Sequence, residues 1–323
     1  MSKPIVYISR LLNEDGLEEL KKNFQIIMNR KRTPPSRKEF LSNAKKADAL
    51  ITSLVEKVDE EVFRAAPNLK VVANYAVGFD NIDLKAAAKY NVPVSNTPGD
   101  YAEAVAEQAM ALLLAVSKRV VEGDRFMRQG KYKAWDPLLL LGDDARGRTL
   151  GIIGTGRIGS FLARMGRLGF NMPIIYYDVT PNQQIEKDYQ ARLVSMKELL
   201  KTSDFVSLHV PLLPTTRHLI GAKEFKAMKP TAILINTARG PVVDEKALVS
   251  ALKKKVIAGA GLDVYEFEPK LASGLSKLDN VVLTPHTASA THAARREMAL
   301  ITSNNIIDVL LQGKRPRNEV RLT

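Results

Sequence analysis

Three groups suited to acid–base and anion chemistry follow apolar runs in the second half of the chain. The run "AILINTARG" ends near Arg239, "AGLDVYEFEP" contains Asp263 and Glu268, and "VVLTPH" ends in His286, one of only four histidines. In a parallel sheet the carboxyl ends of the strands share one edge, where ligands bind. We therefore expect these side chains to converge in one site, where an imidazolium donates a proton near neutral pH and a guanidinium holds a carboxylate.

Each of these residues also has an ordinary structural interpretation. An exposed Arg or Glu usually forms a surface ion pair, and a single histidine is more often a satisfied structural residue. Their joint placement at consecutive strand ends is what favours a catalytic role. The sequence contains no cysteine and no HExxH spacing, so we expect no metal site.

A glycine-rich turn indicates a bound dinucleotide. The strand-like "TLGII" leads into "GTGRIG", an amphipathic helix follows, and Asp178 ends the next strand-like run 19 residues after Gly159. Strand, turn, helix and acid at this spacing separate a Rossmann fingerprint from a chance GxGxxG or a glycine-rich turn without a ligand. The predicted cofactor residues of the turn are Gly154, Gly156, Arg157, Ile158 and Gly159.

Asp178 indicates which nicotinamide cofactor binds. Its carboxylate can accept hydrogen bonds from both ribose hydroxyls and would repel a 2′-phosphate. No arginine follows in "DVTPNQ", so the sequence predicts NAD (NADH) rather than NADP.

Hydride transfer to a ketone explains why these groups occur together. Hydride arriving at a carbonyl carbon leaves negative charge on the oxygen, and His286 is suited to protonate it. Glu268 would fix the imidazole tautomer and stabilise its charged form. Arg239 would hold a 2-oxo acid through its carboxylate and carbonyl oxygens.

The remaining chain is organised as two α/β units. It has 323 residues, 45% of them hydrophobic, enough for two cores. Strand-like and helical runs alternate over 5–97 and again over 149–286, whereas 101–129 is one long helical pattern and 291–311 a terminal helix. We expect two doubly wound parallel-sheet (Rossmann/flavodoxin-like) domains with a cleft between them: a substrate-binding domain of residues 1–98 and 289–323, and a dinucleotide-binding domain of residues 99–288.

Charge and hydropathy limit the classes of partner that we expect the protein to bind. The formal net charge is +13, but 48 basic residues are interleaved with 35 acidic ones, so we expect a small anionic substrate and no nucleic acid, with nucleic-acid binding as the alternative. The longest apolar run, 109–116, is far too short to span a membrane, and no leader-like pattern opens the chain. We expect a cytoplasmic protein without a membrane partner.

The order of the motifs resembles the D-isomer-specific 2-hydroxyacid dehydrogenase family, most closely its glyoxylate/hydroxypyruvate reductase branch. The motifs are "VGFDNID", "VPVSNTPG", "AVAE", "GIIGTGRIG", "DFVSLHVPLLPTT", "NTARG", "GAGLDVYEFEP" and "VVLTPHTASAT", and they cover nearly the whole chain. The resemblance implies NADH-dependent reduction of a small 2-oxo acid, glyoxylate or hydroxypyruvate, to the D-2-hydroxy acid. It assigns substrate binding to Arg239, support of the histidine to Glu268, and acid–base catalysis to His286.

The resemblance implies further assignments that the residues alone do not. A loop at Val77 and Gly78 would hold the substrate carboxylate through backbone amides, and Leu54 would form an apolar wall. The implied cofactor-lining residues are His209, Pro211, Thr237, Ala238 and Asp263, the last beside the nicotinamide carboxamide. Trp135 would reach into the pocket of a neighbouring subunit, with hinge or interface packing as the alternative, and the segment from the long helix onward would form a homodimer.

Departures from the family pattern leave the substrate open. Asp100 and Tyr101 stand where this branch usually has apolar residues, Asp136 follows the tryptophan, and Ala288 replaces a glycine. The loop "ITSLVEK" lacks the arginine expected for a phosphorylated substrate. The alternatives are a D-lactate-type or 3-phosphoglycerate-type dehydrogenase, and an NAD-sensing corepressor-like binding protein.

Overall fold

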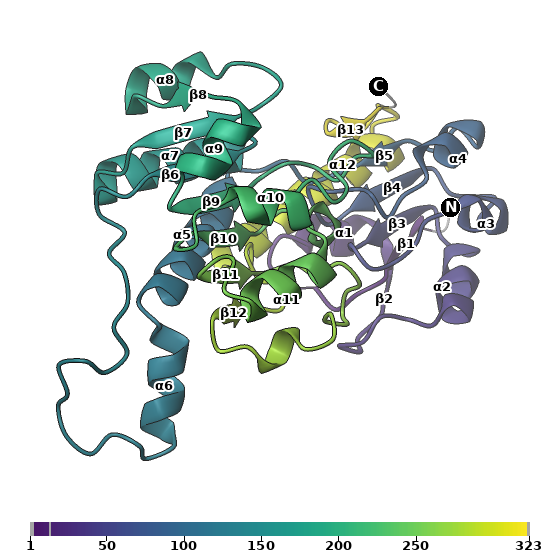
Figure 1. Ribbon diagram of the computed structural model, residues 1–323. Helices are drawn as coiled ribbons and strands as arrows, with labels where there is room; N and C mark the ends of the chain where they lie inside the picture. Colours follow the sequence, from purple (N-terminus) through teal and green to yellow (C-terminus); the bar gives the residue numbers. More distant parts are fainter. Residues whose placement is uncertain (1–2, 13, 322–323) are drawn as a thin grey trace. The chain divides into compact units, whose positions relative to one another are not determined.

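Two parallel sheets, one in each of two units, account for the alternating pattern of the sequence (Figure 1). The computed structural model describes residues 3–12 and 14–321. The first unit comprises residues 1–101 and 291–323, and the second comprises residues 102–290. The predicted domain ranges placed these borders three and two residues earlier, and their residues 1, 2, 13, 322 and 323 lie outside the described part.

The first unit is a six-stranded sheet in the order β13-β5-β4-β3-β1-β2, in which only β13 is antiparallel. Its strands are β1 (Ile5–Ile8), β2 (Gln25–Met28), β3 (Ala49–Thr52), β4 (Val71–Asn74), β5 (Val94–Ser95) and β13 (Glu319–Val320). Its helices are α1 (Glu18–Asn23), α2 (Arg37–Ala44), α3 (Glu60–Ala65), α4 (Leu84–Lys89) and α12 (His292–Leu310). Without β13 this is the flavodoxin-like strand order.

Both faces of this first sheet are buried, which is why its strands are continuous apolar runs. Along β1, Val6 and Ile8 belong to one core cluster and Tyr7 to the other, because successive side chains point to opposite faces. The terminal helix α12 covers the first of these faces with Met298 and Ile306.

The second unit is a seven-stranded, all-parallel sheet in the order β12-β11-β10-β9-β6-β7-β8. Its strands are β6 (Leu150–Ile153), β7 (Ile174–Tyr177), β8 (Arg192–Leu193), β9 (Phe205–Leu208), β10 (Ile233–Asn236), β11 (Gly259–Leu262) and β12 (Val281–Leu283). Its helical elements are α5 (Ala102–Ser117), α6 (Val120–Arg128), α7 (Arg157–Phe170), α8 (Gln183–Tyr189), α9 (Met196–Thr202), α10 (Ala222–Ala227), η1 (Gly240–Val242), α11 (Glu245–Lys253) and η2 (Leu275–Lys277). The strand order reverses between β6 and β9, and this is the Rossmann arrangement and its ligand-binding switch point.

The expectation of one long helix over 101–129 was wrong, because the segment breaks into α5 and α6 (Figure 1). Arg119 adopts a left-handed conformation, with φ 53°. The returning chain occupies the position where another turn would continue: the Ser117 carbonyl accepts the N–H of Asp143 at 2.9 Å, and Arg119 donates to the Leu141 carbonyl at 3.3 Å. Tertiary contacts thus end a pattern that is locally helical.

Helix α6 and the segment 129–148 extend away from the second sheet (Figure 1). No residue of α6 is buried, and the following segment exposes Trp135 and Leu138 at 79% and 74%. Among the described residues, no helix combines the length and apolar character needed to cross a membrane.

Candidate active site

One edge of the second sheet carries most of the predicted site residues. The strand register places Ile153, Leu208, Asn236, Leu262 and Leu283 level with one another. The glycine-rich turn and the loops that begin at His209, Thr237, Asp263 and Thr284 therefore all leave the sheet at this edge. Parallel strands bring together residues that are far apart in the sequence.

His286 and Glu268 form a direct pair. The Nδ1 atom of His286 lies 2.9 Å from Oε2 of Glu268, and both side chains are about one-third exposed. The backbone N–H of Tyr265 donates to the other Glu268 oxygen, Oε1, at 3.0 Å. Because Nδ1 faces the carboxylate, Nε2 is the ring nitrogen left to carry the reactive proton.

The charge of Glu268 is stabilised by its neighbours. Burial raises the pKa of Glu268, but the hydrogen bond and charge of His286, the Tyr265 N–H and the charge of Arg239 together lower it below its ordinary value of 4.5. The carboxylate is consequently ionised at neutral pH. An ionised carboxylate facing Nδ1 can accept a hydrogen bond from that nitrogen and fix the orientation of the ring.

The turn that carries His286 is held by Asp263, which is fully buried. Oδ1 of Asp263 accepts the N–H of Thr287 at 2.9 Å, and Oδ2 accepts the N–H of Ala288 at 2.8 Å. His286 has φ 54° and donates its own N–H to the Asp263 carbonyl at 2.9 Å. A left-handed histidine persists only where its surroundings enforce it, and Asp263 supplies that constraint.

Arg239 is brought to the Glu268 loop by a close backbone approach at Gly240. A Cβ on Gly240 would lie 1.9 Å from the carbonyl carbon and oxygen of Tyr265, so only glycine fits there. The Arg239 carbonyl accepts from the Asn236 side chain at 3.0 Å, and its guanidinium donates to the Ala238 carbonyl at 2.7 Å. The structure therefore brings together Arg239, Glu268 and His286 within the second unit.

The glycine-rich turn fits a dinucleotide phosphate. Gly154 has φ 91°, and a Cβ there would collide with the backbone of His209, so the turn requires glycine. A Cβ on Gly159 would lie 2.2 Å from the Gly154 carbonyl oxygen, whereas nothing lies within 4 Å of a Cβ on Gly156. The space in front of the first turn of α7, which begins at Arg157 and Ile158, is open for backbone N–H groups to meet an anion.

Asp178 lies beside that turn. Its Oδ2 accepts the N–H and hydroxyl of Thr155 at 2.6 and 2.9 Å. Asn182 steadies the same turn by donating to the Thr155 carbonyl at 2.8 Å. This acid at the end of β7 is where a Rossmann fold contacts the adenosine ribose, and Asn182 is a supporting residue that the sequence motif did not single out.

Two buried polar atoms near the switch point lack a hydrogen-bond partner among the described residues: Nδ1 of His209 and Oγ1 of Thr237. The other ring nitrogen of His209 lies 2.9 Å from the Ser207 hydroxyl. Burial lowers the pKa of His209 to about 3, so the ring is neutral at physiological pH. Unpartnered buried polar atoms usually indicate a missing ligand or water, and here they support a cofactor at this edge.

The other two predicted cofactor-lining residues belong to the same loops. The Pro211 carbonyl accepts the Thr216 hydroxyl at 2.6 Å, which closes the turn after β9. The N–H of Ala238 donates to the Asn236 side chain at 3.0 Å. Both contacts fix backbone at the strand ends.

The predicted substrate residues Leu54, Val77 and Gly78 lie in the first unit, at the carboxyl ends of the neighbouring strands β3 and β4. The Asn96 side chain donates to the Val77 carbonyl at 2.8 Å, and that of Asn74 donates to the Gly78 carbonyl at 2.7 Å. In a trans peptide the N–H points opposite to the carbonyl. The N–H groups of Gly78 and the following Phe79 therefore point away from the asparagine side chains that bind the carbonyls of the same peptides.

Trp135 is not brought to the other site residues of its own unit. It lies in the exposed segment beyond α6, and 79% of it is accessible.

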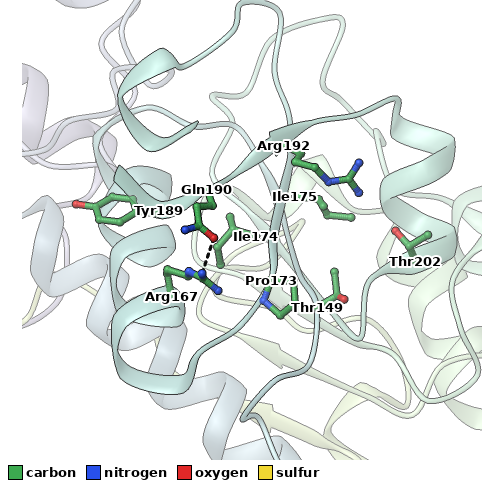
Figure 2. Close-up of a pocket in the computed structure, with 9 residues that line it drawn as sticks. All are labelled: Thr149, Arg167, Pro173, Ile174, Ile175, Tyr189, Gln190, Arg192 and Thr202. Atoms are coloured by element: carbon green, nitrogen blue, oxygen red, sulfur yellow. Dashed lines mark hydrogen bonds between the residues drawn. The ribbon is translucent and has the colours of Figure 1, made fainter. Parts of the chain in front are cut away.

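A surface hollow of about 210 Å³ lies away from this site (Figure 2). It is lined by Thr149 and Pro173, which precede β6 and β7, so it opens at the amino-terminal edge of the second sheet. Arg167 points across it and donates to Oε1 of Gln190 at 2.6 Å. This hollow is at the opposite strand ends from His286 and is no part of the candidate active site.

Known proteins resemble both the second unit and nearly the whole chain. Residues 110–288 match the family model described as D-isomer specific 2-hydroxyacid dehydrogenase, NAD binding domain. The chain is 49% identical to a glyoxylate reductase of Korarchaeum cryptofilum, with 98% of this chain and 96% of that protein covered. It is also 49% identical to a glyoxylate reductase of Thermococcus litoralis, over 98% of this chain and 97% of the relative.

A solved structure is similar over both units. It is an NADPH-dependent glyoxylate/hydroxypyruvate reductase of Sinorhizobium meliloti in complex with NADP and malonate, with a TM-score of 0.82 and 30% identity. The match covers 99% of this chain and 97% of that one.

Proposed function

Since the chain belongs to the D-isomer specific 2-hydroxyacid dehydrogenase family, we propose that it reduces a small 2-oxo acid, glyoxylate or hydroxypyruvate, to glycolate or D-glycerate with NADH. The observation that carries the proposal is the His286–Glu268 pair, 2.9 Å apart, beside Arg239 on the sheet edge that also carries the dinucleotide turn. An acid–base pair, an anion-binding cation and a nicotinamide site are together what reduction of a 2-oxo acid requires.

Arg239 and the turn at Val77 and Gly78 are the proposed holders of the substrate. A guanidinium can bind the carboxylate and the carbonyl oxygen of a 2-oxo acid at once, which fixes the face of the carbonyl that reacts. The N–H groups of the turn are suited to the carboxylate. Leu54, on the neighbouring loop, would form the apolar wall that limits the size of the substrate.

When bound, the reduced nicotinamide supplies the hydride that adds to the carbonyl carbon. His286 then donates the Nε2 proton to the carbonyl oxygen, and the product is the 2-hydroxy acid. Glu268 stabilises the imidazolium before transfer and fixes the neutral ring afterwards. Asp263 keeps the His286 turn in place throughout, and its contact with the nicotinamide carboxamide stays a prediction, because both its carboxylate oxygens bond to that turn.

The residues that would hold the cofactor are those of the turn 154–159, with Asp178 for the ribose and the loops at His209 and Thr237 for the nicotinamide end. Asp178 supports NAD over NADP, because a carboxylate repels the 2′-phosphate. A similar structure holds NADP, so the preference for NADH requires its own experiment.

The proposal includes a homodimer built on the exposed arm, defined here as α6 and the segment 129–148. Its apolar side chains Met127, Trp135, Leu138 and Leu141 are each more than half exposed, and exposed large apolar side chains that occur together on one segment are typical of an interface. Trp135 would enter the pocket of the partner subunit. A cytoplasmic location is part of the same proposal, supported by the cysteine-free composition.

The test is turnover of glyoxylate, hydroxypyruvate, pyruvate and 3-phosphohydroxypyruvate, each with NADH, under one set of conditions. We expect the highest kcat/KM for glyoxylate or hydroxypyruvate. A higher value for pyruvate or for the phosphorylated acid would replace the proposed substrate within the family. NADH binding without turnover of any oxo acid would contradict the enzyme assignment and support a corepressor-like protein.

A further inference from the structure

Glu245 is a buried carboxylate to which the proposed reaction gives no function. It is the first residue of α11 and only 2% exposed. Its Oε1 accepts the N–H of Glu266 at 3.1 Å, and its Oε2 accepts the N–H of Ala272 at 3.1 Å. Both donors belong to the loop between β11 and η2, which carries Glu268.

The contact between Glu245 and this loop is reciprocal. The N–H of Glu245 donates to Oε2 of Glu266 at 3.3 Å, so each glutamate binds the backbone of the other. The second carboxylate oxygen of Glu266 lies 2.7 Å from Nε2 of His218 and 3.9 Å from the guanidinium of Arg217. The loop is thereby attached both to α11 and to the residues before α10.

In the sequence, Glu268 lies between the two residues whose backbone N–H groups bind Glu245. Glu266 precedes it by two residues and Ala272 follows it by four. The Tyr265 hydroxyl adds a third attachment by donating to the Thr284 carbonyl at 2.8 Å, two residues before His286. Removing the Glu245 carboxylate would break one backbone contact on each side of Glu268. The contacts of the Glu266 carboxylate and of the Tyr265 hydroxyl would remain.

The surroundings of Glu245 disfavour its charge. Burial raises the pKa of Glu245, the two N–H bonds lower it, and the charges of Glu266 and Glu268 raise it again, with the net effect upward from 4.5. The nearby charges that act on it are the carboxylates of Glu266 and Glu268. What a carboxylate offers at this position is two acceptor oxygens for two backbone N–H groups.

We propose that Glu245 is a positioning residue for the reaction: its carboxylate holds the loop 264–272 so that Glu268 faces Nδ1 of His286. The inference rests on the proposed function of the Glu268–His286 pair. Glu245 itself touches neither of the reacting groups and acts through the loop.

Two variants separate hydrogen bonding from charge. Glu245→Gln keeps the size of the side chain but turns one acceptor into a donor that faces a backbone N–H. Glu245→Asp keeps the charge and shortens the side chain by one methylene, so it cannot reach both N–H groups. The matched control is Glu224→Gln, which removes a carboxylate from the first turn of α10 that also accepts a backbone N–H, from Gly221 at 3.1 Å.

The first measurement is steady-state glyoxylate reduction with NADH and direct NADH titration. We expect kcat to fall about tenfold in both Glu245 variants, as for small displacements of a catalytic group. The Kd for NADH and the thermal midpoint should stay near those of the wild type, and Glu224→Gln should match the wild type in all three. Wild-type kcat in the Glu245 variants, or equal losses in kcat and NADH affinity, would overturn the proposal.

The second measurement asks whether Glu245 acts through Glu268. In a Glu268→Gln background the Glu245→Gln change should lower kcat less than about twofold, because coupled residues are not additive. The same tenfold loss in both backgrounds would show that Glu245 acts elsewhere.

The third measurement does not depend on turnover. Amide hydrogen exchange of residues 264–272 should speed up in the Glu245→Gln protein, with exchange in β6 and β9 unchanged. If the wild type reduces no oxo acid, the proposed function fails while this exchange result still decides whether Glu245 holds the loop. Unchanged exchange in the loop would overturn the inference by itself.

Discussion

At the scale of single residues, the proposed mechanism depends on Glu268 being ionised where it faces His286. Burial opposes its charge, and the contacts with His286, Tyr265 and Arg239 outweigh that cost. The lowered pKa therefore depends on neighbours in the segments that follow β10, β11 and β12. A carboxylate alone in this loop would not have the lowered pKa.

Glu268→Gln removes this charge while keeping the side-chain size. We expect kcat for glyoxylate to fall about 10²-fold, because the imidazolium loses its stabilising anion. The wild type should lose activity to Glu268 protonation only below its ordinary pKa of 4.5, and the variant should lack that step in its pH profile. A kcat within twofold to threefold of the wild type would remove Glu268 from the mechanism.

The same lowered pKa makes a prediction for stability. A carboxyl whose pKa is lower in the folded than in the unfolded chain stabilises the fold above its unfolded pKa, and that contribution is lost as pH falls through the folded value. Urea unfolding of the wild type and Glu268→Gln should therefore differ most near neutral pH and converge below pH 4.5. A difference that grows toward acid would contradict the sign of the shift.

Asp178 controls the choice between NADH and NADPH in this account. Asp178→Asn removes the charge that repels a 2′-phosphate, and the ratio of kcat/KM for NADH to that for NADPH should fall about tenfold, or about 1.4 kcal/mol. Asp188→Asn, an exposed change on the next helix, is the matched control. A wild type that prefers NADPH would show that Asp178 does not discriminate between the cofactors.

At the scale of elements, the approach of η1 to the Glu268 loop fixes Arg239. Gly240→Ala would place a Cβ 1.9 Å from the Tyr265 backbone, which cannot move aside as a side-chain end can. We expect the free energy of unfolding to fall by about 1–3 kcal/mol, and kcat/KM for glyoxylate to fall about 10²-fold as Arg239 is displaced.

The control for Gly240 is Gly169→Ala in α7, where a Cβ would meet nothing within 4 Å. Urea unfolding and glyoxylate kinetics on both proteins give the comparison. Wild-type values for Gly240→Ala would mean that the contact with Tyr265 is not tight in solution.

The elements that the sequence predicted are those whose signal is local. Both parallel sheets were predicted and are confirmed, because apolar runs bounded by turn residues recur at βαβ spacing and buried strands need no polar alternation. The break at Arg119 was not predicted, since it is imposed by residues 141–143 returning to the end of α5. Strands β8 and β13, of two residues each, are too short to have a pattern.

The reactive residues of the site were likewise more predictable than the residues that hold them in position. His286, Glu268 and Arg239 are reactive types at strand ends, and the structure brings them together. That Asp263 and Glu245 bind backbone N–H groups of the neighbouring loops could not be predicted, because nothing in the sequence says which buried acid accepts from which distant amide. Asn74, Asn96 and Asn182 were missed for the same reason.

At the scale of the whole molecule, two features bear on what the protein binds. The excess of positive charge bears on the substrate, and the exposed arm bears on a second copy of the chain. A net charge of +13 favours the approach of anionic 2-oxo acids, and the effect weakens with salt. The arm belongs to the second unit and carries exposed apolar side chains, which a second copy would cover in the proposed dimer.

Leu138→Asp tests that dimer. Light scattering on the wild type should give twice the chain mass of 35.7 kDa, and a charge placed in the apolar arm should lower the mass toward that of one chain, because an unpaired buried charge destabilises an interface. Leu168→Asp, at a leucine of similar exposure on α7, should leave the mass unchanged. A wild type that is monomeric at every concentration would contradict the proposal.

The central claim is that His286 donates the proton, and the most direct test compares His286→Gln with the exposed control His292→Gln. For each, kcat with glyoxylate and the Kd for NADH are measured on the same preparation. We predict that His286→Gln lowers kcat about 10³-fold, as expected for loss of a general acid, while the Kd for NADH stays within about threefold of wild type and His292→Gln changes neither. A kcat within tenfold of wild type, or losses of equal size in kcat and NADH affinity, would contradict the claim.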